Sequence, residues 1–514
     1  MAFEPRSYPF WGLMAALAGF LSLQAAAYLH AGVFEYPLDD VYIHLAMAAN
    51  IAKGTYGVNA GEAASAASSI LYPFLLVPFP ETELQRMLPL FWNTLAVAGA
   101  GWVWGWIVSE AGLAGLSGGA VAVAGPVLLN VSGVGYTGME AAPHLLASLM
   151  IVLGLWRALT GRGVAAWFIA AAIAAPLLRY EGLALALGAA AVLALRGEVR
   201  AAALIAIGGL GGVMVFSLFL TSIGLDPIPG SILAKKATLG EDEGLAFDIA
   251  FGIYRNLIRP AGALLWLLVL AGILFLLAFP ALRRGPVVWL LVLVLGSAVG
   301  HLVFGQIGWM HRYEPYVLAS LVGTILLAST ALTGGYRFVL QVTAMTAGLA
   351  AGMVYLPGLW GDYVWNPRAI HLQQAQMARF AQDYVKAPVA VNDLGRVAWG
   401  NPSYVLDIWG LGSTEARDIR LDGKDADGWA GPLAASHSVR LAMIYDSWFG
   451  RAAGAGWVRI GRLEMERERG ALGDFEVSFY ATDTADAADL RVQLAAFAPT
   501  LPADARLTIL EVAQ

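Results

Sequence analysis

The stretch GLALALGAAAVLALRGEVRAAALIAIGGLGGVMVFSLFL (182–220) consists of two apolar runs joined by a short basic turn. A helix needs about 17–25 apolar residues to cross the hydrocarbon core of a bilayer, and both runs reach or nearly reach that length. The turn carries Arg196 and Arg200, and basic residues in short loops mark the cytoplasmic side of a membrane protein. We therefore interpret the stretch as a transmembrane helical hairpin whose turn faces the cytoplasm.

Apolar runs of the same kind recur along most of the chain. They cover residues 9–30, 87–108, 113–131, 139–157, 163–179, 181–196, 201–221, 261–281, 287–305, 314–333 and 338–357. Of all residues, 59% are hydrophobic and only 13% are charged, whereas about a quarter of the residues in a soluble domain are charged. The first run exceeds the apolar region of a signal peptide, so we expect a retained helix. The expected fold class is a polytopic α-helical membrane protein with about eleven transmembrane helices.

Basic residues predict how these helices are oriented. If the runs are successive spans, their basic ends alternate onto one side: Arg6, Arg157 and Arg162, Arg196 and Arg200, Arg283 and Arg284, and Arg337. That side is expected to be the cytoplasm of a protein in the inner (plasma) membrane, with its N-terminus inside. Residues 31–86, 132–138, 222–260 and 306–313 then lie outside, together with the whole C-terminal tail.

Composition changes near residue 360 and predicts two domains. The segment from Gly361 to the end holds 20 acidic and 15 basic residues, about half of all the charged residues in the chain. Residues 1–358 form the expected transmembrane catalytic domain, with its first external loop at 31–86. Residues 359–514 form the expected C-terminal extracytoplasmic α/β domain, because the strand-like runs VAVND, SYVLDIWG, VRLAMIYDS and FEVSFYAT alternate with helical segments. The chain has no cysteine, which excludes a disulfide framework.

The first external loop is expected to contain two membrane-associated elements. Residues 40–53 have apolar side chains at helical spacing and are predicted to form an amphipathic helix on the outer membrane surface. Residues 69–79 are apolar but short and broken by prolines, which favours a re-entrant or interfacial helix over a span.

The adjacent carboxylates Asp39 and Asp40, at the start of that predicted helix, are the strongest catalytic candidates. One of them is suited to act as a general base for an acceptor hydroxyl, or the pair to bind a metal ion. The alternative is that they cap the helix. His44 shares a helix face with Asp40, but one histidine with two aspartates is a weak metal pattern, and an interfacial histidine explains it as well.

Other ionisable residues lie at the outer ends of the predicted spans. Glu140 stands in GYTGMEAAPH, and Arg179 and Glu181 stand in a hairpin with almost no loop, where ionisable groups tend to face a cavity or one another. An arginine there suits a phosphate group, and the alternative is a set of interfacial anchors.

Two basic clusters complete the outer face. Lys235 and Lys236 lie beside the membrane and suit either lipid headgroups or the phosphate of a lipid substrate. Arg312 stands between His311 and Glu314 at the start of a span. The chain has no Walker motif, no dinucleotide fingerprint and no HExxH, which argues against an ATP-driven pump and a zinc protease. Energy for any transfer is therefore expected to come with an activated substrate.

The segment LDDVYIHLAMAANIAKGTYGVNAGEAASAASSILYPFLL (38–76) resembles the first external loop of GT-C glycosyltransferases, most closely the branch of the terminal arabinofuranosyltransferases of mycobacterial cell walls. The matching elements are Asp39–Asp40, Tyr42–Ile43, Gly54–Gly57, Asn59–Glu62 and Ala67–Ser69 before Tyr72. Further matches follow in order: Gly138–Met139–Glu140, Arg179–Gly182 with Tyr180 in place of proline, Ile228–Ser231 with Gly230 in place of asparagine, then Lys235, and in the tail Asn392, Asp393, Gly395, Asp407 and Gly410. The resemblance extends from about residue 35 to 415, and the two replacements leave the identity of the sugar open.

The resemblance implies a polyprenyl-phosphate-linked sugar as donor, a glycan or lipid as acceptor, and inversion at the anomeric carbon. Asp39 or Asp40 would be the general base. Arg179, Glu181, Lys235 and Arg312 would bind the donor phosphate, and Tyr42, His44, Glu140, Ser231 and Lys236 are further site candidates. No metal ligands are assigned, although many relatives bind a divalent cation near the first-loop carboxylates. Membrane lipids are expected partners and nucleic acids are not.

Two other functions are compatible with the sequence. A transporter or flippase of lipid-linked sugars would need ionisable residues near the middle of the membrane and a repeated helix pattern, and the sequence shows neither. A non-catalytic membrane scaffold with a glycan-binding tail is the third interpretation.

Overall fold

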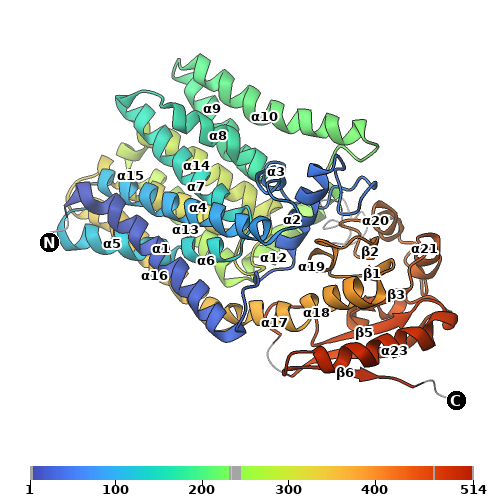
Figure 1. The fold of residues 1–514 in the computed structure, drawn as a ribbon. Helices are drawn as coiled ribbons and strands as arrows, with labels where there is room; N and C mark the ends of the chain where they lie inside the picture. Colours follow the sequence, from blue (N-terminus) through green and yellow to red (C-terminus); the bar gives the residue numbers. More distant parts are fainter. Residues whose placement is uncertain (1–3, 231–232, 234–244, 467–468, 512–514) are drawn as a thin grey trace.

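The computed structural model describes residues 4–230, 233, 245–466 and 469–511. It has two regions that pack against each other (Figure 1). The first is a long helical bundle, and the N-terminus lies at the end of the bundle far from the second region. The second is a domain built on a single mixed sheet, which contains the C-terminus.

A helix lies at each of the predicted apolar runs. These helices are α1 (Tyr8–Ala31), α4 (Glu83–Glu110), α5 (Gly115–Leu128), α7 (Ala141–Arg157), α8 (Ala166–Leu178), α9 (Gly182–Leu195), α10 (Val199–Ser222), α13 (Pro260–Ala278), α14 (Gly285–Phe304), α15 (Pro315–Ala328) and α16 (Gly334–Trp360). Among the described residues, 7 helical segments are long and apolar enough to cross a membrane, and α8, α9 and α15 lie in shorter apolar ones. The architecture is thus that of a polytopic helical membrane protein.

Small residues let the bundle helices approach closely. A Cβ atom added to Gly12 of α1 would lie 2.3 Å from the carbonyl oxygen of Gly101 in α4, and one added to Gly105 would lie 2.3 Å from that of Tyr8. Such close backbone contact is typical of helices that pack in lipid, where van der Waals contact replaces the hydrophobic effect.

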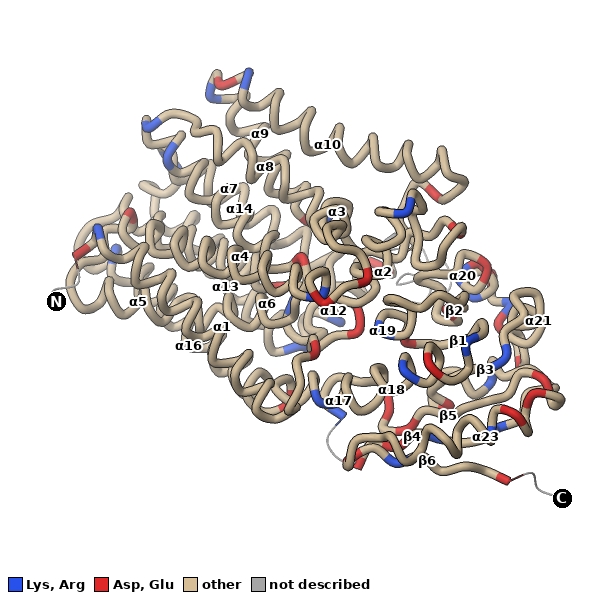
Figure 2. Tube along the Cα trace, viewed as in Figure 1, with Lys and Arg blue, Asp and Glu red and all other residues tan. Residues whose placement is uncertain are grey.

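Charged residues avoid the middle of the bundle. Figure 2 shows them at the end that holds the N-terminus, at the junction with the C-terminal domain, and over that domain. At the end that holds the N-terminus, Arg157 and Arg162 both bind Glu110, at 2.6 and 2.8 Å, and Arg337 donates to the carbonyl of Ala111. Several of the basic residues used to orient the spans therefore do gather at one end.

The first loop has a different location from the predicted one. Helix α2 (Asp40–Ala52) covers nearly the predicted residues, but ten of its thirteen residues are buried, on all sides of the helix. It packs against α19 (Gly395–Ala398) of the C-terminal domain, so the prediction of a helix lying on the membrane surface is wrong. The predicted interfacial helix at 69–79 is a single turn, α3 (Tyr72–Leu75). The other short helices of this face are α6 (Val131–Tyr136) and α12 (Leu245–Leu257).

The C-terminal domain has the expected mixture of helices and strands. Its sheet has the order β2-β1-β3-β5-β4-β6, in which β2, β1 and β3 are parallel and the other neighbours are antiparallel. The strands are β1 (Val389–Val391), β2 (Val405–Asp407), β3 (Leu441–Ile444), β4 (Val458–Met465), β5 (Glu476–Ala481) and β6 (Ala505–Ile509). The helices besides α19 are α17 (Asn366–Leu372), α18 (Gln374–Arg379), α20 (Thr414–Leu421), α21 (Ala430–Ser436), α22 (Asp446–Phe449) and α23 (Ala487–Phe497). Strands β1 and β3 are buried throughout, as expected for central strands covered on both faces.

Specific polar contacts fix the domain on the bundle. The amide of Asn59 in the first loop both donates to and accepts from the backbone of Val405, at 3.0 and 2.9 Å, and so completes the edge of β2. The indole of Trp399 donates to Gln85 at 3.0 Å. Because an unsatisfied buried polar group costs about 1–3 kcal/mol, these pairings define how the two regions dock.

Candidate functional site

A cavity of about 430 Å³ lies between the bundle and the C-terminal domain. Its bundle wall is formed by residues within 37–43, 255–259 and 306–313. Its other wall is formed by residues within 392–394, 409–411 and 471–473, together with Trp448. A concave site with a few convergent polar groups, at the contact of two domains, is the usual location of a substrate site.

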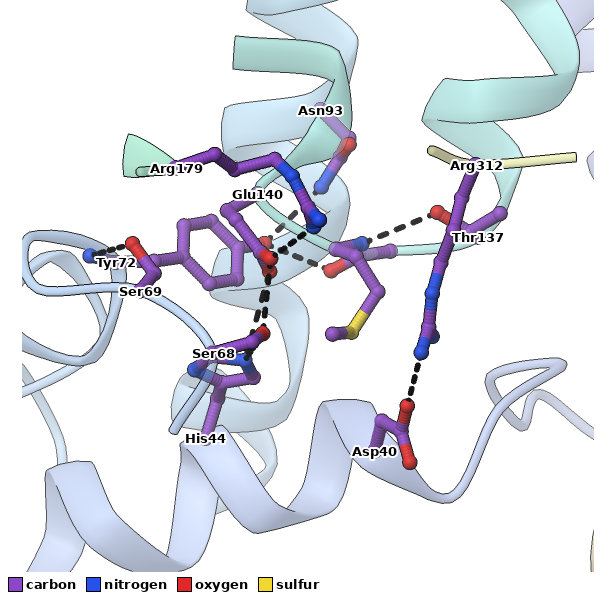
Figure 3. A network of polar contacts seen from close by, with 12 residues as sticks. Asp40, His44, Ser68, Ser69, Tyr72, Asn93, Thr137, Glu140, Arg179 and Arg312 are labelled. Atoms are coloured by element: carbon purple, nitrogen blue, oxygen red, sulfur yellow. Dashed lines mark hydrogen bonds and ion pairs between the residues drawn. The ribbon is translucent and has the colours of Figure 1, made fainter. Parts of the chain in front are cut away.

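Asp40 lies in this cavity, and its carboxylate is held by Arg312. The guanidinium Nη2 of Arg312 is 2.5 Å from Oδ2 of Asp40 (Figure 3). The same Nη2 donates to the hydroxyl of Tyr313 at 3.0 Å, and Arg312 is almost fully buried. The carboxylate of Asp40 remains 34% exposed, so it is both oriented and reachable from the cavity.

Asp39 has a different environment, although it borders the same cavity. Its two oxygens accept hydrogen bonds from the backbone N–H groups of Gly395 and Arg396, at 2.6 and 2.8 Å. It therefore caps the first turn of α19 in the C-terminal domain and makes no capping bond to α2, which corrects the capping alternative. Burial and the nearby carboxylate of Asp393 raise the pKa of Asp39, against the opposing effect of the two N–H donors.

Behind the cavity, Glu140 is the centre of a buried polar network. Its Oε1 accepts from Arg179 and from the hydroxyl of Ser68, each at 2.8 Å, and its Oε2 lies 3.5 Å from Nε2 of His44 (Figure 3). Arg179 also binds Glu181 at 2.9 Å. These predicted candidates do converge, and their charges pair with one another. Oε2 of Glu140, Nδ1 of His44 and Nε of Arg179 have no hydrogen-bond partner in the described part of the chain. Burial lowers the pKa of His44, which favours its neutral form.

Tyr313 joins the network to the cavity. The guanidinium carbons of Arg179 and Arg312 lie 4.9 and 5.0 Å from the centre of its ring. Cation–π contacts of this kind hold the two arginines in fixed positions without using their N–H groups. The network therefore buttresses the residue that orients Asp40.

The remaining predicted candidates fall outside the cavity or outside the described residues. The hydroxyl of Tyr42 donates to the buried carboxylate of Glu35, and its ring packs against Trp399, so it is a packing residue of the domain junction. Ser231, Lys235 and Lys236 lie outside the described residues.

Two arginines that line the cavity, Arg255 and Arg259, were not among the site residues predicted from the sequence. Arg255 donates to the carbonyl of Gly305 at 2.8 Å, and Arg259 donates to the carbonyl of Ile307. Neither has a carboxylate within ion-pair distance in the described part of the chain. Their four-residue spacing in FGIYRNLIRP (251–260), just before an apolar run, was the signal available in the sequence.

The carboxylates of the first loop are not part of a metal-binding cluster in the described residues. Within residues 4–230, 233, 245–466 and 469–511, no group of three or more His, Asp or Glu side chains is arranged to hold an ion. No divalent cation site is therefore assigned to the first-loop carboxylates.

Comparison with known proteins adds one finding. Residues 366–480 match the family of a domain of unknown function, DUF8728. This segment contains β1 to β4 and all but the last residue of β5, and it includes Asn392, Asp393, Trp409 and Trp448 of the cavity wall. No curated protein matches the chain.

Proposed function

We propose that the protein is a GT-C-like glycosyltransferase, most similar to the terminal arabinofuranosyltransferase branch. It moves a sugar, with inversion, from a polyprenyl-phosphate carrier to an extracytoplasmic glycan or lipid. In this proposal all eleven bundle helices cross the plasma membrane, the N-terminus is cytoplasmic, and the cavity and C-terminal domain lie outside. The observation that carries the proposal is the carboxylate of Asp40, fixed by Arg312 at 2.5 Å and reachable from the cavity.

Asp40 is proposed as the general base. The acceptor hydroxyl gives its proton to the Asp40 carboxylate while its oxygen forms a bond to the anomeric carbon of the donor sugar. The bond between that carbon and the phosphate oxygen breaks, and its electron pair leaves with the polyprenyl phosphate. A positioned base of this kind accelerates a reaction by about 10²–10⁴-fold.

The arginines of the bundle wall are proposed to neutralise the leaving phosphate. Arg255 and Arg259 line the cavity and have no carboxylate within ion-pair distance in the described part of the chain, whereas Arg312 lines it while paired with Asp40. Fixed positive groups in a dry site stabilise developing negative charge. Arg179 was expected in this role from the sequence. Its charge is paired with Glu140 and Glu181, so we assign it to positioning, and Arg255 and Arg259 take over its proposed contact with phosphate.

The test is sugar transfer by Asp40→Asn in membranes supplied with labelled lipid-linked sugar. We expect a loss of at least about 100-fold, because the amide has no basic lone pair to accept the proton. Asp226→Asn is the matched control, since Asp226 pairs with Arg417 at 2.6 Å and is absent from the cavity wall. Full transfer by Asp40→Asn would overturn the base assignment. Carrier that crosses the bilayer without forming a glycosidic bond would indicate a flippase.

A further inference from the structure

The two walls of the cavity differ in chemistry. The bundle wall carries Asp39, Asp40, Arg255, Arg259 and Arg312. Arg312 is paired with Asp40, whereas Arg255 and Arg259 have no carboxylate within ion-pair distance in the described part of the chain, so they give this wall its positive charge. Among the described residues, the wall of the C-terminal domain carries the carboxylate of Asp393 and no Arg or Lys. An anionic group is attracted to the first wall and repelled by the second. The second wall therefore suits a neutral, polar part of a ligand.

A buried amide on the second wall has an unused donor. Asn392 is only 6% exposed, and its Oδ1 accepts the backbone N–H of Tyr445 at 2.8 Å. Its Nδ2 has no acceptor in the described part of the chain, although buried amide donors are nearly always bonded. Because Asn392 lines the cavity, a ligand oxygen there would satisfy this donor.

The neighbouring Asp393 is held rigidly at the same wall. Its Oδ2 accepts from the hydroxyl of Tyr445 at 2.7 Å and from the amide of Gln374 at 2.9 Å. These bonds fix the carboxylate beside the amide of Asn392. A donor and an acceptor on adjacent residues match the hydroxyl groups of a sugar ring, which both accept and donate hydrogen bonds.

An aromatic pair faces the same space. The rings of Trp409 and Trp448 lie 5.6 Å apart, and Trp448 is 42% exposed although it is in contact on two sides. Tyr445 meets its ring edge-on at 5.3 Å, and a Cβ on Gly473 would lie 2.4 Å from its Cζ2 atom. The indole is thus fixed in place with part of its surface open, as in a binding platform rather than a flexible surface side chain.

We propose that Asn392, Asp393, Trp409 and Trp448 form a saccharide subsite that holds the acceptor. A neutral sugar ring stacks on Trp448, its hydroxyl groups bond to Asn392 and Asp393, and the group to be glycosylated points to Asp40 across the cavity. The inference rests on the proposed function for the direction of transfer, but binding of a sugar at this wall is measurable without it.

The experiment is saturation-transfer difference NMR on the full chain in nanodiscs. The probes are methyl α-mannopyranoside, methyl β-glucopyranoside, methyl β-galactopyranoside and methyl α-arabinofuranoside, with inorganic phosphate as a competitor. We expect ring C–H signals from at least one glycoside, and phosphate should leave them unchanged because it occupies the arginine wall. Trp448→Ala should weaken binding about 3- to 10-fold, and Trp448→Phe should restore most of it.

Two further variants test whether glycoside binding depends on the residues of this wall. Asn392→Asp keeps the acceptor for the Tyr445 N–H and removes the unused donor, so it should weaken binding about 2- to 10-fold. Trp360→Ala, at an indole that is 46% exposed and outside the cavity wall, should have no effect. Absence of signals from all four glycosides would overturn the subsite, as would equal binding by Trp448→Ala and the wild type. If the wild type forms no glycosidic bond from a lipid-linked sugar while Trp448→Ala still loses glycoside binding, the subsite stands and the proposed function fails.

Discussion

The cavity and the Glu140 network lie side by side at the same end of the bundle, yet they use their charges differently. In the network, Arg179 has two carboxylate partners and Glu140 contacts Arg179, Ser68 and His44. At the cavity, Arg255 and Arg259 bond only to backbone carbonyls in the described part of the chain. Paired charges in a buried place stabilise one arrangement, whereas unpaired ones in a cavity indicate a ligand of opposite charge.

The contrast between paired and cavity-facing charges distinguishes residues that have the same type and similar positions in the sequence. Asp39 and Asp40 are neighbours, but the first bonds to the C-terminal domain and the second faces the cavity. Arg179 and Arg312 both lie at outer helix ends, but only the second borders the cavity. The three predictions below test this contrast, from the largest expected effect to the smallest.

Glu140→Gln should cause the largest loss of stability. It removes the charge that Arg179 binds at 2.8 Å inside a fully buried site, and loss of one partner of a buried ion pair costs about 3–5 kcal/mol. The free energy of unfolding would be measured by titration with sodium dodecyl sulfate. Glu81→Gln breaks the half-exposed pair with Lys53 and is the control, with an expected cost below about 1 kcal/mol. Equal effects of the two variants would show that the network is not structural.

Gly395→Ala should disturb the docking of the two regions. A Cβ there would lie 2.1 Å from the backbone oxygen of Asp39, and neither backbone can move without opening the contact. Overpacking of this kind costs about 1–3 kcal/mol. Hydrogen exchange at residues 395–398 and 37–43 should become faster, while Gly456→Ala, which has open space around its Cβ, should leave it unchanged. Unaltered exchange in Gly395→Ala would mean that the contact is not tight.

The docking should also weaken moderately as the pH rises. Burial and Asp393 raise the pKa of Asp39 from 3.8 to about 8, with a further contribution from Asp40. A carboxyl group with a raised pKa in the folded state contributes its full stability below its unfolded pKa and loses it as the pH passes the folded value. The protection factors at residues 395–398, which compare the observed exchange with the intrinsic rate at the same pH, should therefore fall between pH 4 and 8. Asp393→Asn should flatten this dependence, and an unchanged profile in that variant would contradict the coupling.

Much of the architecture was predictable because apolar length alone places a helix in a bilayer. All eleven predicted runs are helices, and the strands at 389–391, 405–407, 441–444 and 476–481 lie in segments predicted to be extended. Alternation of the runs also predicted that one face holds Asp39, Asp40, Glu140, Arg179, Glu181, Lys235 and Arg312. The structure brings these residues together at one end of the bundle, except Lys235, which lies outside the described residues. The strands β4 and β6 were not predicted.

The sequence by itself thus determined the helical bundle, the change to an α/β domain near residue 360, and the set of ionisable residues at one face. Local physics is sufficient for these features, since hydropathy and charge are properties of each segment. Only the tertiary structure decided which of those residues are paired and which face the cavity. Partners such as Asp39 and Gly395, or Asn59 and Val405, are more than 340 residues apart, and no local pattern specifies a contact at that separation.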